Sequence, residues 1–497
     1  MSLFDKIFNH AGKETAVHPC DIPRGTGGDG LAEFMPDGCM MSKEKIAELL
    51  GTCPEALDEF ERSYSENVLR QSPTDFFDMN AKQAVSRMEH TVHGENDLVD
   101  SLVGRITNEL LAQTSVYSYD GSGETVTTFR YNGEPDTPVT MDEINEVDEA
   151  LRPDLTGTMY KKDLAGSPSD MIMFYYEMWK ASKNPETRQL AYNHFRQGLD
   201  ILDLDPLTYG IIGTNPNSIG HWFHPLVCAV KGTSFFKIPQ TMFLKVPLPL
   251  LQLTRMDYQS LSPTTLRIVD EFCRKAFSLD ENREYFIKTG TYSSKFDFRN
   301  AYVHGAKEVR ELGEYLLFIH YQALQMASPL CTPCIYGVST TNEWAVREFI
   351  PDHDGNPCIY KGLPLRTEYR IFADFDTDEI LGISPYWRPD VMKHRFAHMN
   401  DSDSPHQKHD YVIYLSHQKT LMGRYEASRD TVLHEFGKIV GNIDLSGQWS
   451  VDVMQDGGDF YIIDMASARN SALSDCVPEG RIKDVGENWL PEIPDRK

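Results

Sequence analysis

The sequence lacks any patch of five or more Lys and Arg residues. Its 74 acidic side chains outnumber 48 basic ones, which gives a formal charge of -26. A surface this acidic repels nucleic acid and anionic membranes. We therefore expect no nucleic-acid partner.

Long hydrophobic runs are also missing. The first residues, Met1 to Lys6, contain no apolar segment of the length that a signal peptide needs. Residues 242–253 are interrupted by Lys245, Pro247 and Pro249, and they are too short to span a bilayer. The nine cysteines are scattered and odd in number, as is typical of reduced thiols. These features predict a cytoplasmic protein with no membrane partner.

Metal-binding motifs are scarce. Cys331 and Cys334 form the only C-x-x-C pair, and no second pair lies at the spacing of a zinc site. His221 and His224 have no carboxylate partner in the local pattern. Buried thiols explain the cysteines best, and a metal at either pair is left as a minor alternative.

The chain is long enough for two or three domains, since it has 497 residues, of which 40% are hydrophobic and 11% aromatic. Residues 1–40 contain several Gly and Pro and are predicted to be a flexible segment. Residues 41–230 are predicted to be mostly helical with a small hairpin, and residues 215–230 receive no assignment. The expected helices are 42–51, 54–70, 79–91, 97–114, 169–182 and 185–202, with another opened by a capping box at 140–143 and the hairpin at 116–130.

Short apolar strands begin to alternate with helices at residue 231. This order predicts an α+β domain with antiparallel sheets over residues 231–475, followed by a C-terminal tail over 476–497. The expected strands are 234–239, 241–246, 285–288, 344–350, 367–374, 379–384, 449–454 and 459–464, and the expected helices are 264–277, 306–326 and 426–441.

One apolar strand ends at a lysine. Lys288 is followed by a loop of Gly, Ser and Thr that contains Ser293, Ser294 and Lys295. Small residues let backbone N–H groups approach phosphate oxygens, and ammonium groups neutralise their charge. The pattern indicates a phosphate site, although a Ser-rich turn after a strand is also common without one.

Two further strands combine polar and apolar residues. Glu368 and Arg370 lie two apart on one strand and so share a face, which indicates either a salt bridge on a sheet surface or a polyphosphate contact. The other strand ends in a segment that is able to present backbone groups to an adenine edge. That segment consists of Arg347, Glu348, Phe349 and Ile350.

The last pattern is a hairpin with one carboxylate on each apolar strand. Asp452 and Asp464 flank a turn at residues 455–458. Aspartate is disfavoured in strands and costly to bury without a counter-charge. Mg²⁺ that bridges nucleotide phosphates is the natural cation for such a pair. A structural role, with each carboxylate bonded to a buried Arg or to backbone donors, is the alternative.

Together these four patterns resemble the ATP-grasp superfamily, most closely the branch that contains the eukaryotic cell-division-cycle protein 123 family and related bacterial and phage proteins. The resemblance spans residues 235–473 and rests on the order of the patterns along the chain. It implies an ATP-grasp fold, in which two lobes with antiparallel sheets hold ATP. It also implies ATP and Mg²⁺ as cofactors.

The resemblance assigns a role to the residues of each pattern. Lys288 is expected to contact the α and β phosphates, and residues 293–295 belong to the loop that covers them. Residues 347–350 form the adenine hinge, and Glu368 belongs to the nucleotide site. Arg370 meets the terminal phosphate and, with Lys295, forms the catalytic pair.

The metal ligands implied by the resemblance are Asp452 and Asp464. The family commonly has Asn or another ligand two positions after the last carboxylate, where this chain has Ala466. Ser467 or Asn470 is an alternative ligand, and weaker metal binding is the other possibility. This departure concerns catalysis more than nucleotide binding.

ATP-grasp enzymes generally activate a carboxylate as an acyl phosphate, which an amine or a similar nucleophile then attacks. The resemblance therefore implies a carboxylate–amine ligase that acts on a small-molecule or protein substrate. An ATP-binding assembly factor or chaperone is the alternative from a different class. In that case the N-terminal region docks a protein partner.

Overall fold

The structure, a computed structural model, describes residues 97–122, 126–130, 168–201, 204, 206–256, 261, 263–327, 337–396 and 405–483. Several sequence-based expectations lie outside these residues. They are the segment 1–40, the helices at 42–51, 54–70, 79–91 and 140–143, the pair Cys331 and Cys334, and the end of the tail, 484–497.

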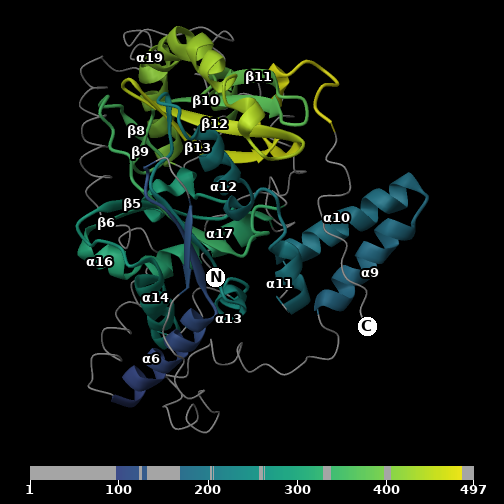
Figure 1. The fold of residues 1–497 in the computed structure, drawn as a ribbon, viewed down its shortest axis with the longest axis vertical. Helices are drawn as coiled ribbons and strands as arrows, with labels where there is room; N and C mark the ends of the chain where they lie inside the picture. Colours follow the sequence, from purple (N-terminus) through teal and green to yellow (C-terminus); the bar gives the residue numbers. More distant parts are fainter. Residues whose placement is uncertain are drawn as a thin grey trace.

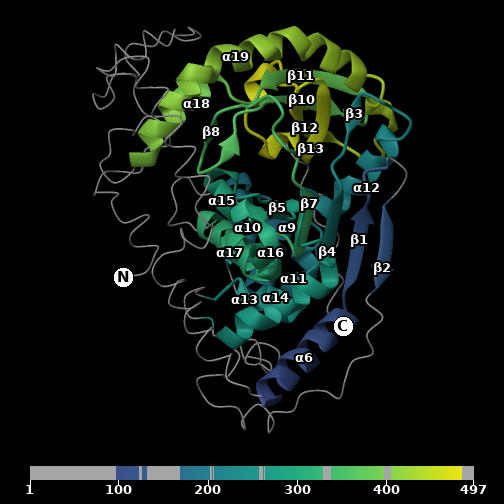
Figure 2. The same ribbon diagram turned by 90° about the vertical axis from the view of Figure 1, so that its left-hand side faces the viewer.

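Two sheets organise the described part of the chain (Figures 1 and 2). Their strands are β1 (Ser115–Tyr119), β2 (Thr127–Arg130), β3 (Phe236–Lys237), β4 (Thr241–Lys245), β5 (Glu284–Thr289), β6 (Tyr302–His304), β7 (Glu343–Glu348), β10 (Thr367–Asp374), β11 (Glu379–Pro385), β12 (Gln448–Asp456) and β13 (Asp459–Ser467). The six-stranded sheet has the order β2-β1-β4-β7-β5-β6, and the five-stranded sheet has the order β11-β10-β12-β13-β3. All neighbours are antiparallel except β13 and β3. The predicted α+β class with antiparallel sheets is confirmed.

Helices surround both sheets, and a short ribbon of β8 (Cys358–Ile359) and β9 (Leu363–Pro364) lies between β7 and β10 in the chain. No described helix is both long enough and apolar enough to cross a membrane. The helices are α6 (Asp97–Ala112), α9 (Pro168–Ala181), α10 (Pro185–Ile201), α11 (Pro206–Ile212), α12 (Ile219–Val230), α13 (Leu248–Leu253), α14 (Pro263–Phe277), α15 (Phe298–Ala301), α16 (Gly305–Arg310), α17 (Leu312–Ala327), α18 (Pro389–Arg395) and α19 (Pro405–Phe436).

The six-stranded sheet packs on α14 and α17, and α6 packs on α14 in turn. Ile287 of β5, Phe272 of α14 and Leu316 of α17 are fully buried in this core. Burial of a side chain of this size contributes roughly 1.5–3 kcal/mol. This core fixes β5, the strand that carries Lys288.

The five-stranded sheet is covered by α19, which lies along β10 and β11 in Figure 2. Tyr425, Val432 and Phe436 recur at helical spacing and are buried against that sheet. The sequence predicted only 426–441 of this helix. It begins earlier because residues 411–415 are buried in a further core around Trp387, and it ends at Phe436.

The predicted hairpin at 116–130 is confirmed as β1 and β2. It belongs to the six-stranded sheet, because β1 pairs with β4 from Val116↔Leu244 to Tyr119↔Thr241. The helices predicted at 97–114, 169–182 and 185–202 are confirmed as α6, α9 and α10. The helices α9 and α10 lie side by side and extend away from the sheets (Figure 1).

The single helix predicted over 306–326 is two helices, α16 and α17, which meet at Glu311. Gly313 approaches the backbone of α14 so closely that an added Cβ atom would lie 2.4 Å from the Val269 carbonyl oxygen. The Asp270 carboxylate accepts a hydrogen bond from the Glu314 backbone N–H at 2.8 Å. The helix restarts at this junction because α14 supplies the acceptor.

The unassigned residues 215–230 contain α12. Trp222 and Phe223 of this helix are buried in a core that includes Phe243 and Ala345 of the six-stranded sheet. The same core includes Tyr369 and other residues of the five-stranded sheet. The helix therefore packs against both sheets, next to the cleft that they form.

Candidate functional site

A cleft between the two sheets collects most of the predicted site residues. Those that line it are Lys288, Ser293, Lys295, Arg347, Glu348, Phe349, Ile350, Glu368, Asp452 and Asp464. They come from β5, the loop after β5, β7, β10, β12 and β13. The structure thus brings together side chains that are as much as 176 residues apart in the sequence. What they bind stays a prediction.

Two predicted residues do not line the cleft. Ser294 is fully buried, has a positive φ of 47°, and donates its hydroxyl to Gln322 Oε1 at 2.8 Å. Its side chain faces α17 rather than the cleft. Arg370 is bonded to the lining residue Asp452.

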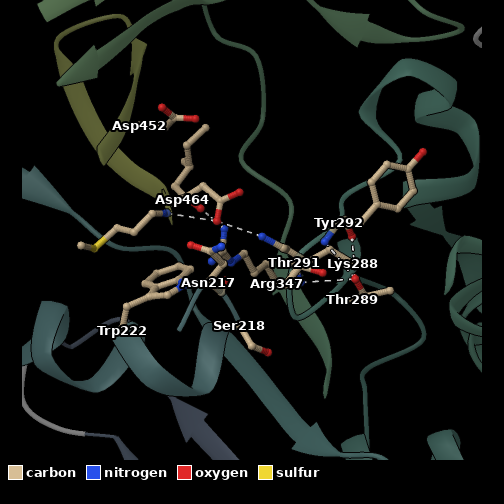
Figure 3. Close-up of polar contacts among 12 residues, drawn as sticks. Asn217, Ser218, Trp222, Lys288, Thr289, Thr291, Tyr292, Arg347, Asp452 and Asp464 are labelled. Atoms are coloured by element: carbon tan, nitrogen blue, oxygen red, sulfur yellow. Dashed lines mark hydrogen bonds and ion pairs between the residues drawn. The ribbon is translucent and has the colours of Figure 1, made fainter. Parts of the chain in front are cut away.

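The centre of the cleft is an ion pair between the two sheets. Lys288 Nζ lies 2.9 Å from Asp464 Oδ1, with 2% of the lysine side chain and 38% of the aspartate side chain exposed. Figure 3 shows Lys288 and Arg347 directed toward Asp464 from the opposite side. Lys288, on a strand buried on both faces, thus meets a carboxylate that is partly exposed.

The charges at this centre shift each other's pKa. Burial raises the pKa of Asp464, but the positive charges of Lys288 and Arg347 outweigh it and hold the pKa below its ordinary value. Burial lowers the pKa of Lys288, and Asp464 offsets this only in part. Asp464 is therefore ionised at neutral pH, and the lysine ammonium depends on an anionic neighbour.

A β-bulge shapes β13 beside this ion pair. Asp452 lies opposite Asp464, but Val453 lies opposite Ile462, so Ile463 is an extra residue in β13. Its carbonyl accepts a hydrogen bond from Arg347 Nη1. Bulges are frequent next to active sites because they redirect side chains. This one ties Arg347 of the six-stranded sheet to the strand that carries Asp464.

Arg370 and Asp452 form a second ion pair, within the five-stranded sheet. Arg370 lies directly opposite Asp452, and two hydrogen bonds of 2.7 Å join the guanidinium to the two carboxylate oxygens. The sequence left open whether Arg370 is part of a salt bridge or contacts phosphate. The structure shows a salt bridge, but its carboxylate is Asp452 of the neighbouring strand and not Glu368 of the same strand.

Lys295, in the loop after β5, contacts Tyr386, the residue that follows β11. Its Nζ lies 3.7 Å from the centre of the Tyr386 ring, and the Arg370 guanidinium lies 5.0 Å from the same ring. Such cation–π contacts contribute about 0.5–2 kcal/mol. In the described part of the chain Lys295 forms no ion pair. Burial raises the pKa of Glu368, and the charge of Lys295 opposes this shift.

One end of the cleft is apolar and adjoins residues 347–350. The N–H groups of Glu348 and Phe349 donate to the backbone carbonyls of Gln240 and Glu284 at 2.9 Å, so they are already used by the sheet. This segment therefore offers mainly side chains to the cleft. The apolar lining comprises Phe286, Phe298, Phe349, Leu363, Pro364 and Met454.

Arg366 is a cleft residue that the sequence reasoning missed. It is 4% exposed, donates to the Ile350 carbonyl, and lies 5.7 Å from the Phe349 ring centre. A signal was present, because Arg366 directly precedes the strand and lies two residues before Glu368, in step with Glu368 and Arg370. Tyr386 and Asn217 were also missed; neither follows a periodic pattern.

Asp452 and Asp464 are carboxylates of the kind that Mg²⁺ prefers, and they lie directly opposite each other on β12 and β13. Mg²⁺ is usually bound by one or two carboxylates together with substrate phosphates. No group of three or more His, Cys, Asp or Glu side chains suited to a metal occurs in the described residues. Phosphate oxygens and water would have to complete the coordination.

Ser467 and Asn470, the two alternative ligands to a residue at position 466, do not contact the pair Asp452 and Asp464 in the described hydrogen bonds. The Ser467 hydroxyl donates to Asn217 Oδ1 at 2.9 Å, and Asn470 is exposed in a short 3-10 helix.

His221 and His224 are exposed on α12, and the Cys228 thiol lies 3.6 Å from His224 Nε2. Within the described ranges neither histidine is part of a cluster suited to a metal.

The chain matches no family model and no curated protein sequence. Among solved structures it is distantly similar to Cdc123 from Schizosaccharomyces pombe. The C-terminally truncated protein has 10% sequence identity and a TM-score of 0.29, with 54% of this chain and 87% of that chain covered. A second Cdc123 structure has 12% identity at the same TM-score of 0.29 and the same coverage of 54% and 87%. A likeness this distant carries no argument about what the cleft binds.

Proposed function

We propose that the cleft between the two sheets binds ATP together with Mg²⁺, as in an ATP-grasp fold. The observation that carries the proposal is the convergence of basic and acidic side chains from opposite sheets. Lys288 and Arg347 enter from the six-stranded sheet, and Asp452 and Asp464 enter from the five-stranded sheet. A triphosphate with a divalent cation satisfies both sets of charges at once.

The position of each group relative to the cleft supports one orientation of the nucleotide. The base is placed at the apolar end, between Phe349 and Met454, because aromatic and aliphatic side chains line it there. The phosphates are placed at Lys288 and Arg347. The terminal phosphate is placed toward Lys295 and Arg370, which flank Tyr386.

Asp452 and Asp464 would hold Mg²⁺, which when bound neutralises charge on the phosphate oxygens. For this to happen the two carboxylates exchange partners. Lys288 moves its ammonium from Asp464 to phosphate, and Arg370 moves its guanidinium from Asp452 to the terminal phosphate. Both exchanges replace one charge-assisted hydrogen bond with another, so neither cation is left without an anion.

We further propose that the reaction is phosphoryl transfer to a carboxylate, followed by capture of the acyl group. An oxygen of the acceptor carboxylate forms a bond to the γ phosphorus as the bond to ADP breaks. A nucleophile such as an amine then attacks the acyl carbon and displaces phosphate. Lys295 and Arg370 stabilise the charge of the transferred group, and the cleft orients it.

The proposal is tested by titration with Mg-ATP. Calorimetry and thermal shift should show binding to the wild type, because a ligand that binds only the folded state raises the melting temperature. Lys438→Ala is a matched control, since this lysine is 53% exposed and pairs with Glu435 on the surface. A flat response of the wild type at millimolar Mg-ATP would overturn the proposal.

Ala466 favours a second candidate function. With a methyl group where the resembling family commonly has a ligand, the cation has fewer protein oxygens, and slow turnover with retained nucleotide binding is the consequence. An ATP-binding assembly factor fits such a site. Multiple turnovers of ADP and phosphate with a small acid and an amine support the ligase. ATP-dependent, stable capture of one protein without turnover supports the assembly factor.

A further inference from the structure

We propose that Asn217 is a positioning residue that keeps Asp464 in place for the metal when the Lys288–Asp464 pair opens. The inference rests on the proposed function and adds a residue that none of the sequence patterns includes. Asn217 belongs to residues 215–220, which precede and begin α12 and which we call the inter-sheet strap. Figure 3 shows Asn217 and Ser218 on the same side of the ion pair as Trp222.

The strap is anchored to the six-stranded sheet. Glu343 Oε2, at the start of β7, accepts the Ser218 hydroxyl at 2.5 Å and the Gly220 N–H at 2.8 Å. The Ile219 N–H donates to the carbonyl of Gly290 at 3.1 Å. Gly290 follows Lys288 by two residues, so this anchor lies at the end of the strand that carries the lysine.

Asn217 joins the strap to the five-stranded sheet by hydrogen bonds. Its Oδ1 accepts two hydrogen bonds from Ser467, from the backbone N–H at 2.7 Å and from the hydroxyl at 2.9 Å. Ser467 ends β13 and follows Asp464 by three residues. The strap therefore joins the end of the lysine strand to the end of the aspartate strand.

The backbone of Asn217 is bonded on both sides. Its backbone N–H donates to Asn215 Oδ1 at 3.1 Å, and its backbone carbonyl accepts the Trp222 indole N–H at 3.3 Å. Asn215 in turn donates to the Thr340 carbonyl at 2.7 Å. A residue fixed in this way defines where the Ser467 backbone lies.

The contact matters most after the nucleotide binds. Lys288 and Arg347 also join the sheets at this end of the cleft, through Asp464 and the Ile463 carbonyl, but both are cations that the proposed function moves toward phosphate. The bonds between Asn217 and Ser467 involve no charged group and do not compete with phosphate. They therefore persist when the ion pair opens, and they keep Asp464 beside Asp452.

The test compares metal affinity with nucleotide affinity in Asn217→Ala. Mn²⁺ binding is measured by electron paramagnetic resonance with saturating adenylyl imidodiphosphate, and binding of the same analogue is measured separately in EDTA. We expect Mn²⁺ affinity to fall by about 10-fold or more, as is typical when a group that orients a metal ligand is removed. Metal-free binding of the analogue should change less than about 2-fold, because no phosphate contact is lost.

Three further variants separate positioning from general loss of structure. Asn217→Asp keeps an acceptor oxygen for Ser467 and should restore most of the Mn²⁺ affinity. Ser467→Ala keeps the N–H but loses the hydroxyl and should give an intermediate loss. His221→Ala is the control, because the side chain of this exposed residue on α12 bonds to the Gly213 carbonyl at 3.0 Å and not to β13, and the substitution keeps its backbone.

The outcomes are distinct. An Asn217→Ala protein with wild-type Mn²⁺ affinity would overturn the inference and leave nucleotide binding standing. Equal losses of metal and metal-free nucleotide affinity would show a structural role, and so would a failure of Asn217→Asp to recover; either result also overturns it. If the wild type binds no nucleotide, the proposed function falls and the inference falls with it.

Discussion

Arg370 and Asp452 lie directly opposite each other on β10 and β12 and share two hydrogen bonds of 2.7 Å. The next strand places Asp464 opposite Asp452, where it is paired with Lys288. Both candidate metal ligands therefore have a cationic partner. A free divalent cation would have to displace a guanidinium and an ammonium group to bind.

From these two pairs we expect metal and nucleotide to bind cooperatively. Bound phosphate accepts hydrogen bonds from Lys288 and Arg370, and both carboxylates are thereby released for the metal. In the presence of an ATP analogue, Mn²⁺ affinity should therefore rise on the order of 10-fold or more, which is within the usual range of coupling energies between two sites. Electron paramagnetic resonance measures this, with Mn²⁺ binding to the free analogue determined separately. Arg370→Gln should tighten Mn²⁺ binding without nucleotide, because Asp452 is then free. Equal wild-type affinities with and without the analogue contradict the partner exchange.

Lys288→Ala should weaken ATP binding by roughly 10-fold or more, since a charge-assisted hydrogen bond is worth roughly 1.5–3 kcal/mol. The lysine is 1% exposed at the end of β5 and has Asp464 as its partner. Calorimetry gives the affinity, and circular dichroism confirms that the variant is folded. Unchanged affinity in a folded variant removes Lys288 from the nucleotide site.

For Asp464→Asn the structure reverses the effect on stability that the sequence suggests. From the sequence alone, two like charges repel across the hairpin, so removal of one is expected to keep or raise the stability of the metal-free protein. In the structure the substitution leaves buried Lys288 beside Arg347 with no carboxylate of its own.

We therefore expect Asp464→Asn to lower the melting temperature of the metal-free protein. The loss should stay below the roughly 3–5 kcal/mol of a fully buried pair, because the aspartate side chain is 38% exposed. Turnover should fall on the order of 100-fold, since a metal ligand is lost. Scanning calorimetry and an ADP-release assay measure the two effects. A variant that is less stable but fully active would assign Asp464 a structural role only.

All strands of the two sheets except β6 were predictable from the sequence, because each of them is a short apolar run with clear ends. The polar residues on them were also predictable as a set, since Lys288, Asp452 and Asp464 stand out in apolar strands. Their partners were not. The register that places Arg370 opposite Asp452 depends on pairing between strands about 80 residues apart, and the bulge at Ile463 leaves no mark in the sequence.

The strap was unpredictable for a different reason. Residues 215–220 have neither helical nor strand periodicity, and their contacts with Glu343 and Ser467 join segments 123–250 residues apart. The extent of α19 was missed because its first half packs on a local core instead of the main sheet. In both cases tertiary contacts determine the structure more than local pattern does.

Glu311, at the junction of α16 and α17, should make stability depend on pH. Burial raises its pKa to about 7, and the charges of Glu314 and Glu308 add to this against Lys307. The folded pKa is thus above the unfolded value of 4.5, so the folded protein binds the proton more tightly. This contribution to stability is complete below pH 4.5 and is lost as the pH rises toward about 7.

Glu311→Gln should remove that dependence, since a neutral amide has no proton to lose. At pH 8 we expect the variant to be more stable than the wild type, by on the order of 1 kcal/mol after allowance for the partial exposure of the side chain. Urea denaturation at pH 5 and pH 8 measures the difference, and Glu426→Gln on the exposed face of α19 is the control. A variant that gains nothing at pH 8 contradicts the assignment.

Ala466 provides the last prediction, a gain of metal affinity. It lies two residues after Asp464, beyond the bulge, on the same face of β13 and opposite Ser450. Ala466→Asn therefore places an amide oxygen beside the two carboxylates. Mn²⁺ affinity in the presence of an ATP analogue should rise roughly 10-fold, equivalent to about 1.4 kcal/mol for one added oxygen ligand.

Turnover should rise along with this affinity if the missing ligand limits catalysis. Ala466→Leu is the matched control, because it fills the same space without an oxygen and should not tighten metal binding. If Ala466→Asn binds Mn²⁺ no better than the wild type, the cation does not lie between Asp452 and Asp464. In that case the two ion pairs with Arg370 and Lys288 are the permanent partners of these carboxylates, and the cleft holds its ligand without a metal at this position.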